Sequence, residues 1–154
     1  MENAPQSTRL VLWGILLANF IRNFAYQVNE IVMARFIPVE LNGDSSVYGL
    51  VVGVFSFSQF LFMIPLAKWS DRVGRRNVLI LCYATFSLGM FLFSFVQTLQ
   101  ELIIFRFIHG SGAYAGVIMA LINDIFPEGQ RGKPIALFTA GLGLGALGGR
   151  PSGD

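Results

Sequence analysis

The chain has 154 residues, of which 54% are hydrophobic and 13% charged, and its formal net charge is +2. A soluble domain usually carries about 25% charged residues, so this chain has too few to cover a globule in water, and lipid is the expected solvent for much of it. One histidine, one cysteine and scattered acids form no metal-ligand cluster. No serine lies in a recognisable nucleophile motif, and no phosphate-binding loop is present. We therefore expect no enzyme activity and no cofactor.

Four apolar segments are long enough to cross a bilayer, which takes roughly 20 residues of helix. These segments are 10–37, 45–67, 77–100 and 102–123. A fifth segment, 135–149, has only 15 residues and then meets Arg150 and Pro151, which predicts an incomplete helix. We therefore expect an all-α, polytopic membrane helix bundle in which residues 1–154 form a partial transmembrane domain.

Five polar residues of the first segment recur at steps of 3, 1, 3 and 4 residues, which places them on one face of an α-helix. This polar stripe consists of Asn19, Arg22, Asn23, Tyr26 and Glu30. A charge at the centre of a membrane helix costs about 2.5–3.5 kcal/mol, so the stripe is expected to face protein or a water-filled cavity. Two interpretations remain open: a structural polar interface, or the lining of a substrate path in which Glu30 takes up a proton. Gln59 in the second segment is a weaker candidate for the same lining.

Basic residues lie mostly on one side of the predicted bundle. The amino-terminal tail and the second and fourth connections hold seven Lys and Arg residues, whereas the other side holds only Arg35 beside three acids. The seven are Arg9, Lys68, Arg72, Arg75, Arg76, Arg131 and Lys133. Because cytoplasmic loops carry an excess of Lys and Arg, the amino terminus is expected in the cytoplasm. The basic residues are thus topology signals at the lipid bilayer, and no nucleic-acid partner is expected.

The connection between the second and third segments carries the most specific pattern in the chain. It contains a small residue, an acid, a glycine and three arginines at fixed spacing, namely Ala67, Asp71, Arg72, Gly74, Arg75 and Arg76. Taken by itself it is a tight cytoplasmic connection, in which Gly74 is free to adopt a positive φ and Asp71 to cap the start of a helical turn. The basic side chains would hold such a loop at an anionic leaflet.

This pattern resembles the signature that transporters of the major facilitator superfamily carry between their second and third helices. Five positions match, while the family's leading glycine is replaced by Ala67, which is expected to loosen a close helix approach. The resemblance implies that Asp71 and Arg75 help to hold two halves of a transporter together in one conformational state, with Asp124 as a third member. The predicted conformational latch therefore comprises Asp71, Arg72, Gly74, Arg75, Arg76 and Asp124.

The fourth segment resembles the fourth helix of the same family, in which an arginine is followed four residues later by glycine. Here these are Arg106 and Gly110, and Gly110, Gly112 and Gly116 are expected to allow close helix packing. Arg106 is open to two interpretations: it snorkels to the outer interface, or it is buried and assists proton movement, as the resemblance implies. His109 is expected to hydrogen-bond to a neighbouring helix.

The resemblance implies the first part of a six-helix major-facilitator half, in the inner or plasma membrane. The expected function is secondary active transport of a small solute by alternating access, coupled to H⁺ and dependent on C-terminal helices that the chain lacks. The glycine-rich run 141–149 resembles the fifth-helix motif of the antiporter branch without its proline, which gives a slight preference for efflux of organic compounds. The alternative is a small four-helix membrane anchor or assembly protein without transport activity.

Overall fold

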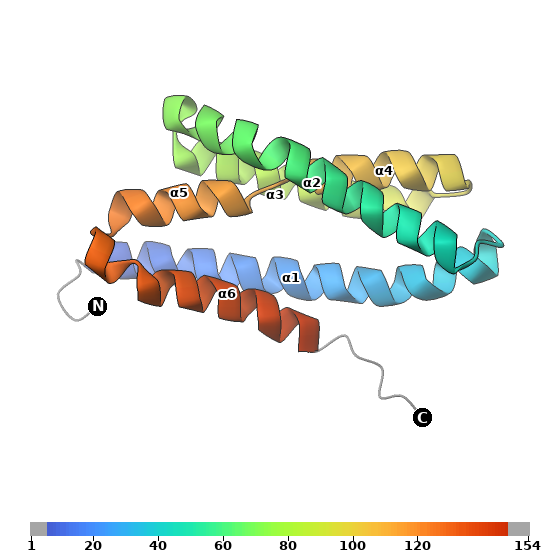
Figure 1. Cartoon of the computed structure of the whole chain (residues 1–154), viewed down its shortest axis with the longest axis horizontal. Coiled ribbons are helices and arrows are strands. Elements are labelled where there is room, and N and C mark those ends of the chain that lie inside the picture. The colour runs from blue at the N-terminus through green and yellow to red at the C-terminus, as the bar shows by residue number, and fades with distance from the viewer. Residues whose placement is uncertain (1–5, 148–154) are drawn as a thin grey trace. The chain divides into compact units, whose positions relative to one another are not determined.

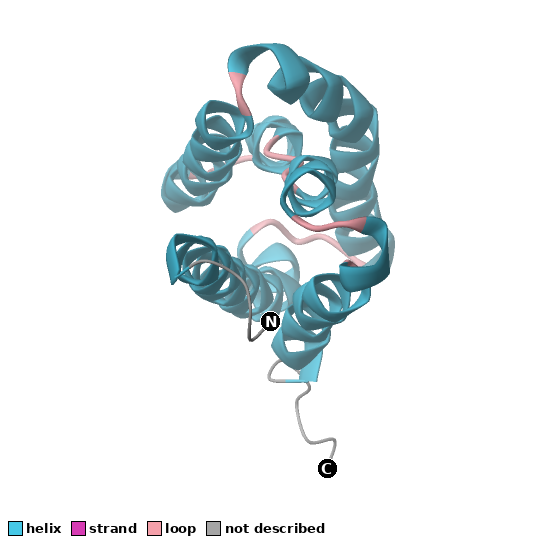
Figure 2. Ribbon diagram, turned by 90° about the vertical axis from the view of Figure 1, so that its left-hand side faces the viewer, coloured by secondary structure: helices cyan, strands magenta, loops and turns pink. Residues whose placement is uncertain are grey.

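The computed structural model describes the backbone of residues 6–147 and the side-chain surroundings of residues 13, 14 and 16–140. Every regular element in this part of the chain is a helix, as Figures 1 and 2 show, so the predicted all-α class is confirmed. In chain order the elements are α1 (Gln6–Glu40), α2 (Ser45–Val73), α3 (Arg75–Leu92), the 3₁₀ turn η1 (Phe93–Phe95), α4 (Leu99–Ser111), α5 (Ala115–Ile125), η2 (Glu128–Gln130) and α6 (Gly132–Leu147).

Three helical stretches within the described residues are long and apolar enough to cross a membrane: Ser45–Val73, Arg75–Phe95 and Leu99–Ile125. The first two overlap the predicted segments 45–67 and 77–100 but end at different residues, and the third runs through α4 and α5. α1 is not among them, because the amides and charges of the polar stripe lower its mean hydropathy. That α1 also spans the membrane remains a prediction.

The chain divides into two compact units, which are described separately. The larger unit, Met33–Leu121, contains the end of α1, then α2, α3, η1, α4 and the first part of α5. The smaller unit contains α1 up to Val32 and the described residues from Ile122 onward.

Two short connections define the ends of α2 in the larger unit. At its start, the side chain of Asp44 accepts hydrogen bonds from the backbone N–H groups of Ser46 and Val47, both at 3.0 Å, which satisfies donors that an uncapped helix leaves free. At its end, Gly74 adopts φ +98° and donates its N–H to the carbonyl of Ser70 at 3.1 Å. α3 begins at the next residue, so the predicted connection of residues 68–76 is reduced to a single glycine.

This short connection corrects one expectation about Asp71. Helix α2 continues to Val73, six residues beyond the predicted end of the apolar segment. The onset of polar side chains shows where a span leaves the lipid, but the backbone hydrogen bonds of the helix continue past that point. Asp71 therefore lies in the last turn of α2 and does not cap the start of a helical turn; its carboxylate forms an ion pair with Arg75.

The fourth predicted segment is interrupted. α4 ends at Ser111 and α5 starts at Ala115, and the three residues between them are buried and non-helical. Gly112 has φ −73° and ψ 47°, outside the helical region. Glycine is about 1 kcal/mol less favourable than alanine inside a helix, so Gly110 and Gly112 weaken the helix where it meets both of its neighbours.

Helices α2, α3 and α4 pack against one another, and Figure 1 shows them side by side. Glycine permits the contacts: a Cβ on Gly110 would lie 2.5 Å from the carbonyl oxygen of Phe55 on α2. A Cβ on Gly112 would lie 2.5 Å from the carbonyl oxygen of Cys82 on α3. Ser58 Oγ on α2 donates a hydrogen bond to the carbonyl of Phe107 on α4 at 2.7 Å. The predicted role of these glycines in close packing is confirmed.

In the smaller unit, Arg131 completes the end of α5. Its Nε donates to the carbonyl of Phe126 at 2.8 Å and its Nη2 to that of Asn123 at 3.0 Å, which satisfies carbonyls that the helix end leaves free. α6 begins three residues before the predicted fifth segment. The side-chain surroundings of the glycine-rich run 141–149, and residues 148 and 149 altogether, lie outside the described residues.

Candidate functional site

The polar stripe of α1 is buried while its apolar neighbours are not. Asn19, Arg22 and Asn23 are 0%, 7% and 8% exposed, and Tyr26 and Glu30 are half-buried. The residues between them include three large hydrophobics that are about half exposed or more: Phe20, Ile21 and Phe24. This is the reverse of a helix on a water-soluble protein, and it is the pattern expected when the surrounding solvent is lipid.

Within the stripe, Asn23 is fixed by its own helix. Its Nδ2 donates to the backbone carbonyl of Asn19 at 2.8 Å and lies 2.9 Å from the Oδ1 of the same residue. The two amides therefore form one hydrogen-bonded group, one turn apart. Gln59 is half-buried on α2 in the larger unit, and its predicted place on a path shared with the stripe remains a prediction.

Arg106 is fully buried in the larger unit, at 0% exposure. Its guanidinium carbon lies 5.0 Å from the ring centroid of Phe55 and 5.7 Å from that of Phe93. Its Nη1 is 3.5 Å from Nδ1 of His109. Of the two interpretations left open by the sequence, this placement favours the buried arginine over one that snorkels to the interface.

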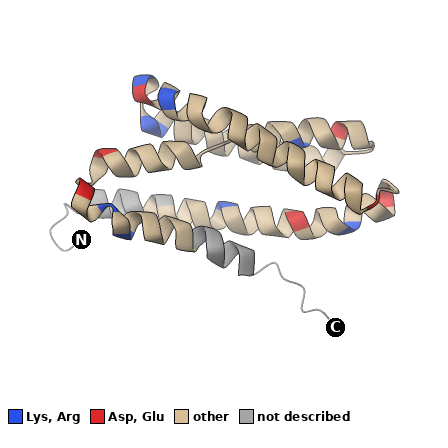
Figure 3. Ribbon diagram, viewed as in Figure 1, with Lys and Arg blue, Asp and Glu red and all other residues tan. Residues whose placement is uncertain are grey.

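The latch residues of the larger unit surround the junction of α2 and α3. Arg75 pairs with Asp71, and its Nη1 also donates to the carbonyl oxygen of Ala67 at 3.1 Å and to Ser70 Oγ at 2.5 Å. The side chain of Arg75 is only 16% exposed, compared with 58% for Asp71. Figure 3 shows charged residues gathered at this end of α2 and α3.

The remaining arginines of the latch differ from Arg75. Arg72 and Arg76 are exposed, which is what a topology signal at a lipid surface requires. Asp124 belongs to the smaller unit, so its approach to Asp71 remains a prediction.

A cleft of about 420 Å³ lies beside the latch, between α2 and α5. Its walls include Met63, Ala67 and Asp71 from α2 and Gly116 from α5. A Cβ on Gly116 would lie 2.9 Å from the carbonyl oxygen of Met63 and 3.3 Å from the Cβ of Ala67. The expected loosening at Ala67 is therefore not observed, because glycine on the opposite helix leaves room for the alanine methyl group.

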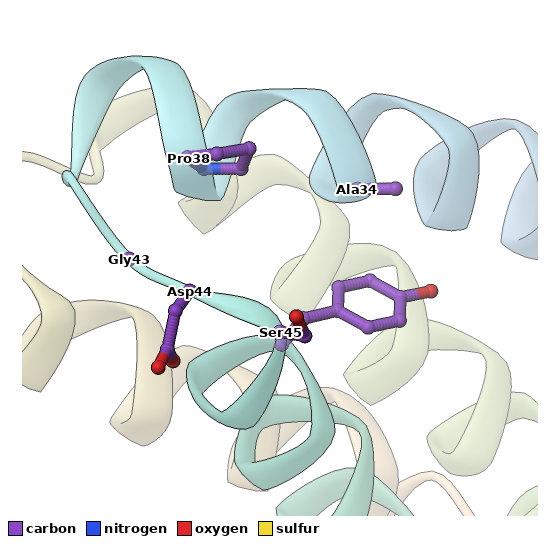
Figure 4. Close-up of a pocket in the computed structure, with 6 residues that line it drawn as sticks. Ala34, Pro38, Gly43, Asp44 and Ser45 are labelled. Carbon is purple, nitrogen blue, oxygen red and sulfur yellow. The ribbon is translucent and has the colours of Figure 1, made fainter.

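A second cavity, of about 410 Å³, lies at the other end of α2. Figure 4 shows its lining: Ala34, Pro38, Gly43, Asp44, Ser45 and Tyr48. One carboxylate oxygen of Asp44 is already used as the helix cap.

No three His, Cys, Asp or Glu side chains in the described part of the chain come together as a metal ion would require. The features with functional chemistry there are the stripe, the buried Arg106 and the latch. Sequence reasoning missed Phe55 and Phe93 as partners of Arg106, because phenylalanines are abundant in the chain and neither residue belongs to a recognisable motif.

The helices, their apolar outer faces and the inward polar groups define a multi-pass protein of the cell membrane. The chain belongs to the Major Facilitator Superfamily, whose sequence model matches residues 15–153.

Three curated relatives are similar to parts of the chain. An uncharacterized transporter of Buchnera aphidicola subsp. Acyrthosiphon pisum is 33% identical over 68% of this chain and 27% of its own length. The inner membrane transport protein YajR of Escherichia coli is 26% identical over 88% of this chain and 30% of its own length. Multidrug resistance protein 3 of Bacillus subtilis is 29% identical over 92% of this chain and 28% of its own length. The matches thus span less than a third of each relative.

Proposed function

We propose that the chain contributes to a secondary active transporter, which moves a small solute across the cell membrane by alternating access and is coupled to protons. The observation that carries this proposal is the buried polar stripe of α1, in which Asn19, Arg22 and Asn23 face inward and apolar residues face outward. Polar and charged groups are expensive to place in a membrane protein; they face the bundle interior or a water-filled cavity, pair with one another, and mark substrate or ion pathways.

The two charges of the stripe support different roles. Arg22 and Glu30 are eight residues apart, which corresponds to roughly 12 Å along an α-helix. That spacing does not favour a direct ion pair along their own helix, so we propose that each charge has its partner on another helix or in the transported solute. In this proposal Glu30 takes up and releases the coupling proton, while Arg22 and the amides contact the solute.

Efflux of an organic compound is the finer proposal. One relative is named as a multidrug resistance protein, and the glycine-rich run of the chain resembles the motif of the antiporter branch. Both observations favour export over uptake.

The latch is proposed to hold one of the alternating conformations. Asp71 and Arg75 are fixed to each other at the α2–α3 junction, beside the cleft between α2 and α5. In this proposal the latch closes against helices outside this chain, in keeping with the small share of each relative that the chain covers.

The test compares flux in two matched variants of the longest reading frame that contains the chain. Everted membrane vesicles are energised with a pH gradient, and uptake of a fluorescent organic cation is followed with time. Glu30→Gln removes a titratable group from the stripe, whereas Glu40→Gln removes an exposed carboxylate at the end of α1. We expect gradient-driven flux to fall more than tenfold in Glu30→Gln and to be unchanged in Glu40→Gln.

Two other outcomes would contradict the proposal. An anchor or assembly protein would show no flux above empty vesicles with any of a panel of organic cations, anions and neutral solutes. Equal flux in Glu30→Gln and in the unaltered protein would remove Glu30 from proton coupling. Membrane insertion of both variants is measured alongside, so that lost flux is not confused with lost protein.

A further inference from the structure

The only histidine of the chain lies in an enclosure of phenyl rings together with Arg106. His109 is 0% exposed, and its ring centroid lies 5.0 Å from that of Phe55, 4.2 Å from that of Phe86 and 5.3 Å from that of Phe93. We call these three phenylalanines the aromatic cage. They come from α2, α3 and η1, so the cage forms only when the larger unit is folded.

The backbone around His109 leaves the imidazole little freedom to move. A Cβ on Gly89 of α3 would lie 2.5 Å from the Cβ of His109 and 2.6 Å from its Cα. α3 therefore touches α4 at the base of this side chain, and the cage surrounds the ring itself. The position of His109 is determined by packing on several sides.

The chemistry of the contact with Arg106 determines how the imidazole is protonated. Arginine carries only donors, so when Nη1 approaches Nδ1 of His109 to 3.5 Å, Nδ1 must act as the acceptor. The ring proton then resides on Nε2. The two residues are three apart on α4, a spacing that brings side chains together on one helix face.

The cage also offsets the cost of burying the guanidinium. The faces of Phe55 and Phe93 present negative quadrupole charge to the cation at 5.0 and 5.7 Å, a contact that is stronger when it is desolvated. Nδ1 of His109 contributes a lone pair to Nη1 of the guanidinium. Together these groups hold a permanent positive charge at a defined place in an apolar setting.

We propose that His109 is a positioning residue for Arg106, and that the neutral imidazole, fixed as the Nε2–H tautomer, holds the guanidinium against Phe55 and Phe93. Nothing in the family resemblance required a histidine or the cage. The effect on transport rests on the proposed function, but the tautomer and the contact do not.

The direct test is ¹⁵N NMR of the imidazole, which gives one pair of signals because the chain has a single histidine. The 154-residue chain is labelled with ¹⁵N-histidine, reconstituted in phospholipid vesicles and measured at neutral pH. We expect an unprotonated Nδ1 and a protonated Nε2. A doubly protonated ring, an Nδ1–H tautomer or a mixture of tautomers in the unaltered chain would overturn the proposal.

A variant at Arg106 shows whether this residue causes the single tautomer of His109. Arg106→Met keeps an unbranched side chain and removes every donor, so the single tautomer should give way to a mixture. An unchanged imidazole spectrum in this variant would mean that Arg106 does not fix the ring.

Transport by the protein encoded in the longest reading frame that contains the chain shows whether His109 positions Arg106 or only fills space. His109→Asn keeps an acceptor near the place of Nδ1, and His109→Phe keeps a ring and removes the acceptor. We expect His109→Asn to retain most of the flux and His109→Phe to lose more than tenfold, at equal membrane insertion. Equal flux in the two variants would overturn the positioning role. Absence of flux in the unaltered protein would refute the proposed function. The NMR result would still show whether Arg106 fixes the tautomer of His109.

Discussion

Arg75 on α3 donates a hydrogen bond across the α2–α3 junction to the carbonyl oxygen of Ala67, eight residues earlier, at 3.1 Å. The same side chain donates to Ser70 Oγ and pairs with Asp71, so one guanidinium holds the last two turns of α2 at three points. A planar guanidinium can serve several acceptors at once, whereas an ammonium group is a compact point charge.

Replacing Arg75 by lysine should therefore weaken the junction although the charge is kept. Hydrogen bonds to charged groups contribute about 1.5–3 kcal/mol, and we expect Arg75→Lys to lose about 1–2 kcal/mol, because the ammonium retains part of the contact with Asp71. Reversible unfolding in mixed micelles measures the change. Arg76→Lys, at an exposed position, is the control and should lie within about 0.5 kcal/mol of the unaltered chain. Equal losses in both variants would contradict the role assigned to Arg75.

Gly74 is the one described glycine with a positive φ, and it is the entire connection between α2 and α3. A side chain at φ +98° is strained even where there is room for it, at a cost of about 1–3 kcal/mol. Gly74→Ala should lower the unfolding free energy by that amount in the same micelle assay. Gly53→Ala is the matched control, because residue 53 is helical and a Cβ there meets nothing within 4 Å. It should be neutral or stabilising, and a loss as large as that of Gly74→Ala would refute the argument from φ.

Gly112, directly after α4, allows the backbone there to touch that of α3. A Cβ at this position would lie 2.5 Å from the carbonyl oxygen of Cys82 and 3.1 Å from the backbone nitrogen of Phe86, and backbone atoms cannot turn aside. Overpacking of this kind costs about 1–3 kcal/mol and should separate the helices. The sole cysteine reports on it, since Cys82 is buried and should react faster with a maleimide in Gly112→Ala. In Gly49→Ala, where a Cβ meets nothing, the reaction should stay slow. Unchanged protection of Cys82 in Gly112→Ala would show that the contact is not needed.

Ser58 and Ser56 lie two residues apart on α2 and differ in their partners. Ser58 donates to Phe107 of α4, whereas Ser56 donates to Val52 of its own helix. Hydrogen bonds between membrane helices contribute about 0.6 kcal/mol on average, so Ser58→Ala should destabilise the unit by about that amount. Ser56→Ala should have almost no effect. Thermal denaturation in detergent, followed by circular dichroism and averaged over several melts, measures the difference between the two variants. A larger loss of stability in Ser56→Ala than in Ser58→Ala would contradict the role assigned to Ser58.

The membrane helices of the larger unit could be predicted because uninterrupted apolar runs leave few alternatives. Residues 45–67 carry no charge, and α2 starts at the first of them. Gly74 was also identifiable, because a glycine between polar residues at the end of such a run usually terminates a helix. The predicted end of α2, at residue 67, was too early. Hydropathy indicates where the lipid-facing part of the chain ends, whereas the helix continues for about another turn and a half, to Val73.

The interruption after Ser111 and the aromatic cage could not be predicted, for different reasons. A glycine-rich stretch is compatible with a continuous helix packed closely and with a broken one, and contacts with two neighbouring helices decide between them. The cage depends on residues 55, 86 and 93, which come from α2, α3 and η1 and are far from one another in the sequence. Phenylalanine that faces lipid and phenylalanine that faces protein look alike in a sequence, because a membrane span is apolar on every side.

The three non-helical residues between α4 and α5 also determine what surrounds this part of the chain in the membrane. Each backbone N–H or C=O group left without a partner in hydrocarbon costs several kcal/mol, so irregular backbone at membrane depth is tolerated only next to protein or in a water-filled space. Gly112, Ala113 and Tyr114 are all buried within the larger unit. Residues 112–114, in the middle of the stretch Leu99–Ile125, are thereby kept away from lipid, and lipids and detergents contact this stretch at other positions, such as the exposed Ile104.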